Sequence, residues 1–393
     1  MTSEKVIYLD HAATTPVADK VLAAMRLYFQ ENFGNPASVH RCGVLAAQAV
    51  NAARDQVASL LNASTDEVYF TSGGTESNNW AIQGMLGGGK KQHFITSAIE
   101  HHSVLNCIHF IRRVFRVPAT ILPVNEYGQV EPETLRKAIR DDTVLVSIMH
   151  ANNEIGTVQA IRELADIAHE KGILFHTDAV QSVDKIPVDV EELGVDLLSL
   201  SAHKFSGPKG VGALFIRQGT RIQAFHHGGG QEGGLRAGTL NVSGIVGLGA
   251  AAALAQANLK SQMVRERELR EQLWHGLSTR IKNVRRNGHP QRCLPNILSI
   301  SMPGVDGLSI QLGLDLRGIQ VSLGSACATG SPETSHVLRA IGISADLARG
   351  SIRFSLGRGN TSAEIRRVIE VMPKIVSALR QEEMPSGEPQ AGY

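Results

Sequence analysis

Residues 173–210, ILFHTDAVQSVDKIPVDVEELGVDLLSLSAHKFSGPKG, decide the fold of this chain. A first apolar run, Ile173–Phe175, leads into Asp178, and a second, Leu197–Leu200, leads into the segment Ser201–Gly210. Short apolar runs separated by amphipathic segments are typical of buried strands in a parallel sheet. Ligands of such sheets bind beyond the carboxyl ends of the strands, so Asp178 and the segment after Leu200 are expected to border a binding crevice.

The same alternation extends in both directions along the chain. From Pro16 to Leu61 apolar residues recur at three- and four-residue spacing, which predicts two helices divided by Gly34-Asn35-Pro36. Strand-like runs occur at Val68–Phe70, Phe94–Ile95, Ile121–Leu122, Val144–Met149, Ile173–Phe175, Leu197–Leu200 and Val211–Ile216. This pattern predicts an α/β fold with a mostly parallel sheet covered by helices.

The length and a change of pattern predict two domains. With 393 residues the chain can build two cores, and a long helical stretch from Gly244 to Ile281 follows a Gly-rich passage. Beyond it the strands are fewer, at Ile297–Ser301 and Ile352–Phe354. We expect a large domain over residues 16–260, a smaller α/β C-terminal domain made of 1–15 and 261–382, and a disordered polar tail over 383–393.

Composition excludes several classes of protein. Lys and Arg together number 39 and Asp and Glu 37, without long runs of one charge, which argues against nucleic-acid binding. The N-terminus has no apolar signal core, and no stretch approaches about eighteen uninterrupted apolar residues, so a cytoplasmic protein without a membrane span is expected. Four scattered cysteines without a C-x-x-C pair predict neither a disulfide framework nor a zinc site.

A lysine, a carboxylate and a glycine turn together favour pyridoxal phosphate as the cofactor. Lys204 lies between a histidine and a Gly-Pro turn, and it can form the Schiff base that this cofactor needs, while Asp178 can keep the pyridine nitrogen protonated. The segment 68–76, VYFTSGGTE, has the pattern of a strand, a tight turn and a helix start that suits a phosphate. Taken alone, this segment would be interpreted as an ordinary strand-to-helix turn without a ligand. Lys209 is a weaker rival because no histidine precedes it.

Ten motifs in order resemble those of the cysteine desulfurase family. They span residues 8 to 357 and read YLDHAATTP, GNPAS, TSGGTES, EHHSV, HANNEIG, HTDAVQS, SAHKFSGPKG, RAGTLN, GSACATG and SIRFSLG. The resemblance implies the aspartate-aminotransferase-like fold type I of pyridoxal-phosphate enzymes, and a homodimer.

The resemblance also implies a role for each matching residue. Lys204 matches the Schiff-base lysine, Asp178 the partner of the ring nitrogen, and His101 the histidine stacked on the ring. We also expect His101 to be catalytic, as the proton carrier that activates the Cys327 thiol. The other matches are Asn153 and Gln181 near the ring hydroxyl; Gly74, Thr75, Ser201 and His203 at the phosphate; Thr239 at the phosphate of the other subunit; and Asn153 and Arg353 at the substrate carboxylate. Gly74 departs from the commoner alanine.

The resemblance implies a reaction that depends on Cys327. L-Cysteine would become L-alanine while its sulfur passes to Cys327 as a persulfide, for delivery to a sulfur-acceptor protein such as an iron–sulfur scaffold. The small residues around Cys327, SLGSACATGSP, suit a long mobile loop. A selenocysteine lyase or related lyase would share the cofactor site without needing Cys327, and a non-catalytic scaffold would not need Lys204. These alternatives remain open at the level of the sequence.

Overall fold

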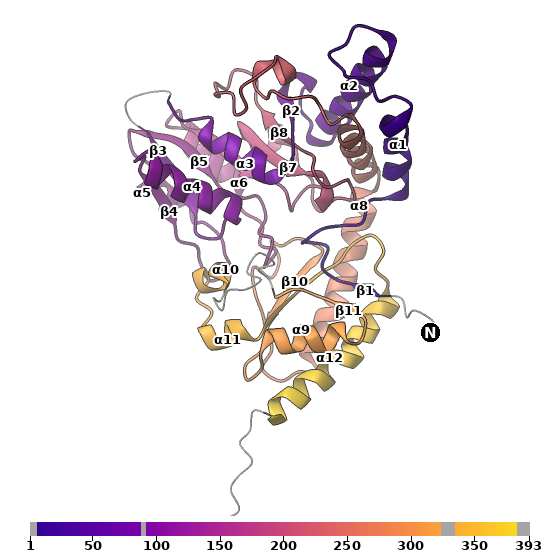
Figure 1. The fold of residues 1–393 in the computed structure, drawn as a ribbon. Coiled ribbons are helices and arrows are strands. Elements are labelled where there is room, and N and C mark those ends of the chain that lie inside the picture. The colour runs from indigo at the N-terminus through magenta and orange to yellow at the C-terminus, as the bar shows by residue number, and fades with distance from the viewer. Residues whose placement is uncertain (1–5, 88–91, 324–334, 383–393) are drawn as a thin grey trace, which may run out of the picture.

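The computed structural model describes residues 6–87, 92–323 and 335–382. The predicted nucleophile Cys327 and the predicted disordered tail lie outside these residues. Two hydrophobic cores lie one above the other in Figure 1, and the long helix α8, Val242–Ser278, runs from one core into the other.

The larger core surrounds a seven-stranded sheet. Its strands lie in the order β2-β8-β7-β6-β5-β3-β4. Their bounds are β2 Val68–Thr71, β3 His93–Ser97, β4 Ala119–Leu122, β5 Thr143–Ser147, β6 Leu174–Asp178, β7 Leu197–Ser201 and β8 Gly212–Ile216. Neighbours from β7 to β4 are parallel, and β8 is antiparallel to both β7 and β2. The predicted α/β class, the seven strands and the mostly parallel sheet are confirmed.

Helices cover both faces of this sheet. They are α1 Asp19–Gln30, α2 Arg41–Leu61, α3 Gly74–Gln83, α4 His102–Val114, α5 Pro132–Ala138, α6 Ile161–His169 and α7 Val190–Leu193, with the start of α8 Val242–Ser278. Successive residues of β7 point to opposite faces: Leu197 belongs to a buried cluster with residues of α3 and α4, and Leu198 belongs to another with residues of α1, α2, α6 and α8. Burial on both faces explains the continuous apolar runs in the sequence.

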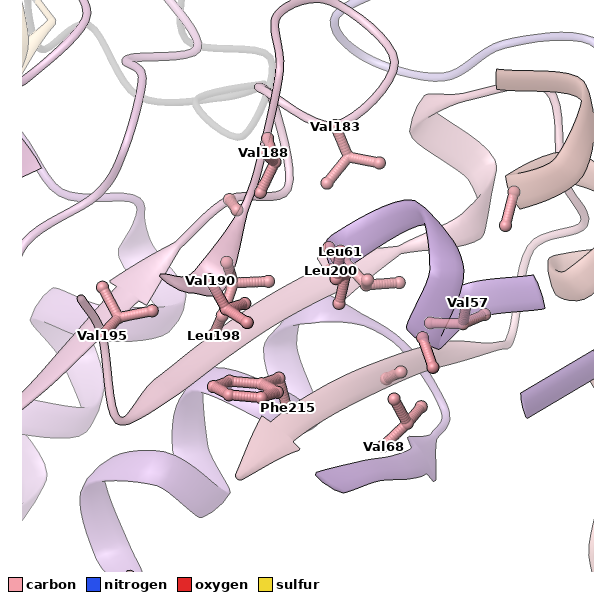
Figure 2. Packing of buried hydrophobic residues seen from close by; sticks show 14 of the residues in the cluster. Val57, Leu61, Val68, Val183, Val188, Val190, Val195, Leu198, Leu200 and Phe215 are labelled. Carbon is pink, nitrogen blue, oxygen red and sulfur yellow. The ribbon is translucent and has the colours of Figure 1, made fainter. Parts of the chain in front are cut away.

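Figure 2 shows part of the core between α2 and the sheet. Val57 and Leu61 of α2 lie against Leu198 and Leu200 of β7 and Phe215 of β8. Each of these side chains is almost fully buried and contributes about 1.5–3 kcal/mol through removal of apolar surface from water. This packing fixes β7, and therefore the segment that follows it, against the body of the protein.

The smaller core contains a three-stranded antiparallel sheet in the order β12-β10-β9. Its elements are β9 Arg285–Arg286, β10 Ile297–Ser301, α9 Gly307–Asp315, β11 Ile319–Gln320, β12 Ser351–Ser355 and α12 Ser362–Glu382. Helices α10 His336–Ala340 and α11 Ala345–Arg349 instead pack in a separate cluster with Ile99, Met149 and Ile155. The N-terminal strand β1, Ile7–Tyr8, pairs in parallel with β11. The sequence predicted β10 and β12, and it did not predict the two-residue strands β1, β9 and β11.

Helix α8 belongs to both cores. Its first half, with Ile245 and Leu248, packs in the larger core, and Leu269, Leu273 and Leu277 pack in the smaller one. Among the described residues it is the one helix with the length and composition of a membrane span, and half of its apolar window is buried inside the protein. Packing against α1 and α2 accounts for this apolar stretch. The predicted domain boundary at residue 260 falls within this helix, so the division into domains stays a prediction.

Candidate active site

A cavity of about 250 Å³ lies at the carboxyl ends of β6 and β7, beside the start of α3. Its lining brings together most of the predicted site residues, namely Gly74, Thr75, His101, Asn153, Asp178, Gln181, Ser201, His203, Lys204 and Arg353. Thr239 does not line this cavity and is exposed on the surface of the chain. Cys327 is outside the described residues.

Lys204 ends a short 3₁₀ helix, Ala202–Lys204, that directly follows β7. Its Nζ donates to the backbone oxygens of Ala12 at 2.6 Å and Ala13 at 2.9 Å. The amine is therefore held on the wall of the cavity by the N-terminal segment. Lys209, the weaker rival, is exposed and does not line this cavity; it lines an adjoining hollow that shares Gly74 and His203 with the cavity. The geometry favours Lys204 as the reactive lysine.

Asp178 is the last residue of β6 and is almost fully buried. Its Oδ2 accepts from Nδ2 of Asn78 at 2.7 Å, and its Oδ1 accepts from the backbone N–H of Val180 at 2.9 Å. These two donors fix the carboxylate at the edge of the sheet. Asn78 is a site residue that the sequence reasoning missed, because it lies 100 residues away from its partner.

The turn before α3 is shaped for an anion. Gly73 has φ +149°, which favours glycine, and Gly74 opens the helix whose free N–H groups face the turn. A Cβ on Gly74 would lie 2.7 Å from Cγ2 of Val180, so the turn has no room for a side chain there. Glu76 is held by Arg236, whose Nε donates to it at 2.8 Å. Glu76 in turn accepts from the backbone N–H of Ser72 at 2.8 Å, so the N–H groups left for a ligand are those at the start of α3.

His203 faces the same end of the cavity. Burial, together with the positive charges of Lys204 and Lys209, lowers the pKa of His203 to about 4. Its Nδ1 lies 3.1 Å from the hydroxyl of Thr14. A neutral imidazole at this place can donate one hydrogen bond to a phosphate.

His101 is the N-cap residue of α4, and its ring is anchored through one nitrogen. Nδ1 accepts from the backbone N–H of Ser103 at 3.1 Å and lies 2.8 Å from the hydroxyl of Ser103. Burial lowers the pKa of His101, the nearby Asp178 raises it, and Lys204 lowers it. The ring is held against the wall of the cavity in its neutral form at neutral pH.

Arg353 comes from β12 and is 2% exposed. Its Nη2 donates to Oδ1 of Asp10 at 2.7 Å, and its Nη1 donates to the backbone oxygen of Asn153 at 2.9 Å. Asn153 thus contacts the arginine through its main chain. Gln181 is turned toward the N-terminal segment, where its Nε2 donates to the backbone oxygen of Ala12 at 2.9 Å. Asp10 is a second residue that the sequence reasoning missed.

Three further ionisable residues line the cavity without having been predicted. Glu154 is buried, and burial raises its pKa while the charge of Arg353 lowers it. The rings of His102 and His336 lie 4.9 Å apart, and burial lowers the pKa of each. Glu154 stands inside the motif HANNEIG, and this position was the one signal that pointed to it.

The donor set of the cavity fits pyridoxal phosphate. A primary amine, a buried carboxylate and a glycine turn at a helix N-terminus lie on one cavity wall, and the missing Cβ atoms at Gly73 and Gly74 leave the backbone accessible. Among the residues that the structure describes, no group of three His, Cys, Asp or Glu side chains is arranged to hold a metal ion.

Comparisons with known proteins agree with this site. The family model described as aminotransferase class-V matches residues 7–368. Proteins named cysteine desulfurase IscS from Methanosarcina thermophila and Dictyoglomus turgidum are each 50% identical to this chain; the matches cover 96% of this chain and 94% and 96% of those proteins, respectively.

Solved structures give the same result. A structure titled NifS-like protein superposes with a TM-score of 0.89 at 40% identity, covering 95% of this chain and 100% of that one. The apo structure of cysteine desulfurase from Thermococcus onnurineus NA1 has a TM-score of 0.85 at 26% identity, covering 95% of both chains. The predicted fold class and family are confirmed: the chain belongs to the aminotransferase class-V family and, within it, to the cysteine desulfurases.

Proposed function

We propose that this enzyme converts L-cysteine to L-alanine and leaves the sulfur on Cys327 as a persulfide, with pyridoxal phosphate bound at Lys204. In this reaction the Cβ–S bond of cysteine breaks and an S–S bond to Cys327 forms. L-Cysteine and one thiol give L-alanine and one persulfide, so that no external oxidant or reductant is needed. The observation that carries the proposal is the shared cavity of Lys204, Asp178, His101 and Arg353 in a chain of this family.

The cavity offers a partner for each part of the cofactor. Lys204 would form the covalent bond, Asp178 would pair with the ring nitrogen, and Gln181 and Asn153 would border the ring hydroxyl. The phosphate would bind at Gly74, Thr75, Ser201 and His203. When bound, pyridoxal phosphate supplies an electron sink that stabilises negative charge at the substrate Cα.

The side chains of the protein supply binding and proton transfer. Arg353 would bind the substrate carboxylate, a task for which a guanidinium is suited because it donates in a planar fork. The Lys204 amine, once released, would take the Cα proton at Nζ, and its acceptors Ala12 and Ala13 keep it on the cavity wall. Cys327 would attack the substrate sulfur as a thiolate.

A homodimer is part of this proposal. The surface of α1 and the segment after it exposes large apolar side chains in the single chain, among them Leu22, Leu27, Phe29, Phe33 and Val39. A second copy of the chain would cover them, since contiguous apolar surface of this kind favours association. The exposure of Thr239 is compatible with a contact to the cofactor phosphate of the partner subunit.

The persulfide would pass to a sulfur-acceptor protein in the cytoplasm. An iron–sulfur scaffold is the acceptor class that we favour, because the relatives at 50% identity carry the name IscS. The names of these relatives also favour a cysteine desulfurase over a selenocysteine lyase.

The test is incubation of the purified enzyme with L-cysteine and a reductant, with sulfide and alanine both measured. We expect equal amounts of the two products from the intact enzyme and from Cys42→Ala, which changes an exposed cysteine, and neither product from Cys327→Ala. Turnover that survives in Cys327→Ala would contradict the persulfide mechanism. Selenocysteine serves as a second substrate, because a lyase would release alanine from it without Cys327.

A further inference from the structure

A chain of hydrogen bonds joins Asp178 to His101 across the cavity wall. Nδ2 of Asn78 donates to Oδ2 of Asp178 at 2.7 Å and to the hydroxyl of Ser103 at 2.8 Å. The hydroxyl of Ser103 then lies 2.8 Å from Nδ1 of His101. Asn78, Ser103 and Asp178 are all more than nine-tenths buried, so water does not compete at most of these atoms.

The direction of each hydrogen bond follows from the chemistry at the Asp178 end. A carboxylate oxygen only accepts, so the amide of Asn78 must turn its NH₂ group toward Asp178. The second hydrogen of that NH₂ group points to Ser103 Oγ, which therefore accepts. The single hydrogen of the Ser103 hydroxyl is left to point at Nδ1 of His101.

The backbone gives the same result for His101 independently. The N–H of Ser103 also points at Nδ1, at 3.1 Å, because His101 caps the N-terminus of α4. Nδ1 thus accepts from two donors and carries no proton. A neutral imidazole with an accepting Nδ1 has its proton on Nε2, which is the ring nitrogen left for the cavity that His101 lines.

We propose that Ser103 and Asn78 are positioning residues that hold His101 in the Nε2-protonated tautomer. His101 then presents an N–H group to the substrate, and no lone pair. In this form the ring donates a hydrogen bond to the substrate. To take a proton from a thiol it must first change tautomer, which requires that both donors at Nδ1 be displaced. This inference rests on the proposed function for the identity of the substrate, and the tautomer itself does not depend on it.

The charges around His101 support the neutral ring. Burial lowers its pKa, and the charge of Lys204 and any charge on His102 and His336 act in the same direction. Asp178 acts against them. Two hydrogen bonds donated to Nδ1 stabilise the neutral ring further, because imidazolium has no lone pair to accept them.

The direct test is nuclear magnetic resonance of the holoenzyme labelled with ¹⁵N-histidine, without substrate, in which long-range proton–nitrogen correlations identify the tautomer. The His101 signals are assigned by their absence in His101→Asn. We expect a protonated Nε2 and an unprotonated Nδ1. A ring protonated at Nδ1 would overturn the inference even if the enzyme is fully active as a desulfurase.

Kinetics test the part played by Ser103. Ser103→Ala removes one donor at Nδ1 and is expected to mix the tautomers and to lower kcat about fivefold with little change in KM, the size expected for one neutral hydrogen bond. Ser103→Thr keeps the hydroxyl and should restore both readouts. Ser309→Ala is the matched control, because the Ser309 hydroxyl also hydrogen-bonds the N-cap residue of its helix, α9, and Ser309 does not line the cavity. An unchanged tautomer and kcat in Ser103→Ala would overturn the role of Ser103.

Discussion

Arg353 and Asp10 form a salt bridge, Nη2 to Oδ1 at 2.7 Å, between residues that are 343 positions apart in the chain. The arginine lies on β12 of the smaller core, and the aspartate follows β1 at the N-terminus. The bridge therefore orients the proposed substrate-binding arginine from outside its own sheet. It also ties the N-terminal segment, which holds Lys204, to the residue that would bind the substrate carboxylate.

Asp10→Ala tests this orientation. Loss of a hydrogen bond to a charged group costs about 1.5–3 kcal/mol, so we expect KM for L-cysteine to rise roughly tenfold or more while kcat changes less. Steady-state kinetics with alanine as the measured product separate the two constants. Glu271→Ala is the control, because it removes a carboxylate that pairs with Arg270 and Arg286 and does not line the cavity. An unchanged KM in Asp10→Ala would show that Asp10 does not orient Arg353 for substrate binding.

The two lysines of SAHKFSGPKG should behave differently. Lys204→Ala is expected to abolish the absorption of the cofactor Schiff base and to lower activity by at least about a hundredfold, as expected for loss of the group that moves the proton. Lys209→Ala should retain the Schiff-base absorption and lose much less activity, because Lys209 lines only the adjoining hollow at the proposed phosphate end and not the main cavity. Visible absorption spectra of the two purified variants decide the point. A spectrum that survives in Lys204→Ala and is lost in Lys209→Ala would reverse the assignment.

Gly74→Ala should weaken cofactor binding in this chain. The new Cβ would lie 2.7 Å from Cγ2 of Val180, and Val180 also donates its backbone N–H to Asp178. Overpacking typically costs about 1–3 kcal/mol, so the dissociation constant for pyridoxal phosphate should rise about tenfold, as measured by titration of the apoenzyme.

A second substitution separates crowding from any other effect of the new alanine. Val180→Ala removes Cγ2, so Gly74→Ala combined with Val180→Ala is expected to recover most of the lost affinity. Gly359→Ala is the control, because a Cβ there meets nothing within 4 Å. If the double variant binds as weakly as Gly74→Ala alone, crowding against Val180 is not the cause.

The sequence was sufficient for the seven strands of the larger sheet and for the position of Asp178 and Lys204 beside the cavity. Asp178 and Lys204 each follow a buried apolar run, so their place at the sheet edge could be predicted from the pattern alone. Asn78 and Asp10 could not be predicted in this way. Their partners lie 100 and 343 residues away, and no local pattern records which side chains meet once the sheets are formed.

The strands that were missed have a related physical cause. β1, β9 and β11 contain two residues each, which is too short for an alternation of apolar and polar residues to be recognised. Their strand geometry comes from pairing, as in the parallel pair of Ile7 with Ile319. The register of such pairs depends on the packing of the whole smaller core.

Buried histidines should make the stability of this protein depend on pH. His176 in β6 is fully buried between the hydroxyls of Ser147 at 2.8 Å and Ser199 at 2.9 Å, and burial lowers its pKa from 6.5 to about 3. In the unfolded chain this histidine therefore binds a proton below about pH 6.5, whereas in the folded protein it binds one only near pH 3. Stability is lost as the pH falls through this window, and from pH 7 to pH 5 this one residue accounts for about 2 kcal/mol.

His176→Gln removes this titration while keeping a polar side chain between the two serines. The variant is expected to be less stable at pH 7, because Gln fills the site less well. Between pH 7 and pH 5, however, its free energy of unfolding should fall by about 2 kcal/mol less than that of the unsubstituted protein. Urea unfolding at the two pH values measures the difference, and His227→Gln, at an exposed position, should leave it unchanged. An equal loss of unfolding free energy in His176→Gln and in the unsubstituted protein would mean that the His176 ring is protonated in the folded state at pH 5. Both serine hydroxyls would then accept hydrogen bonds from the ring.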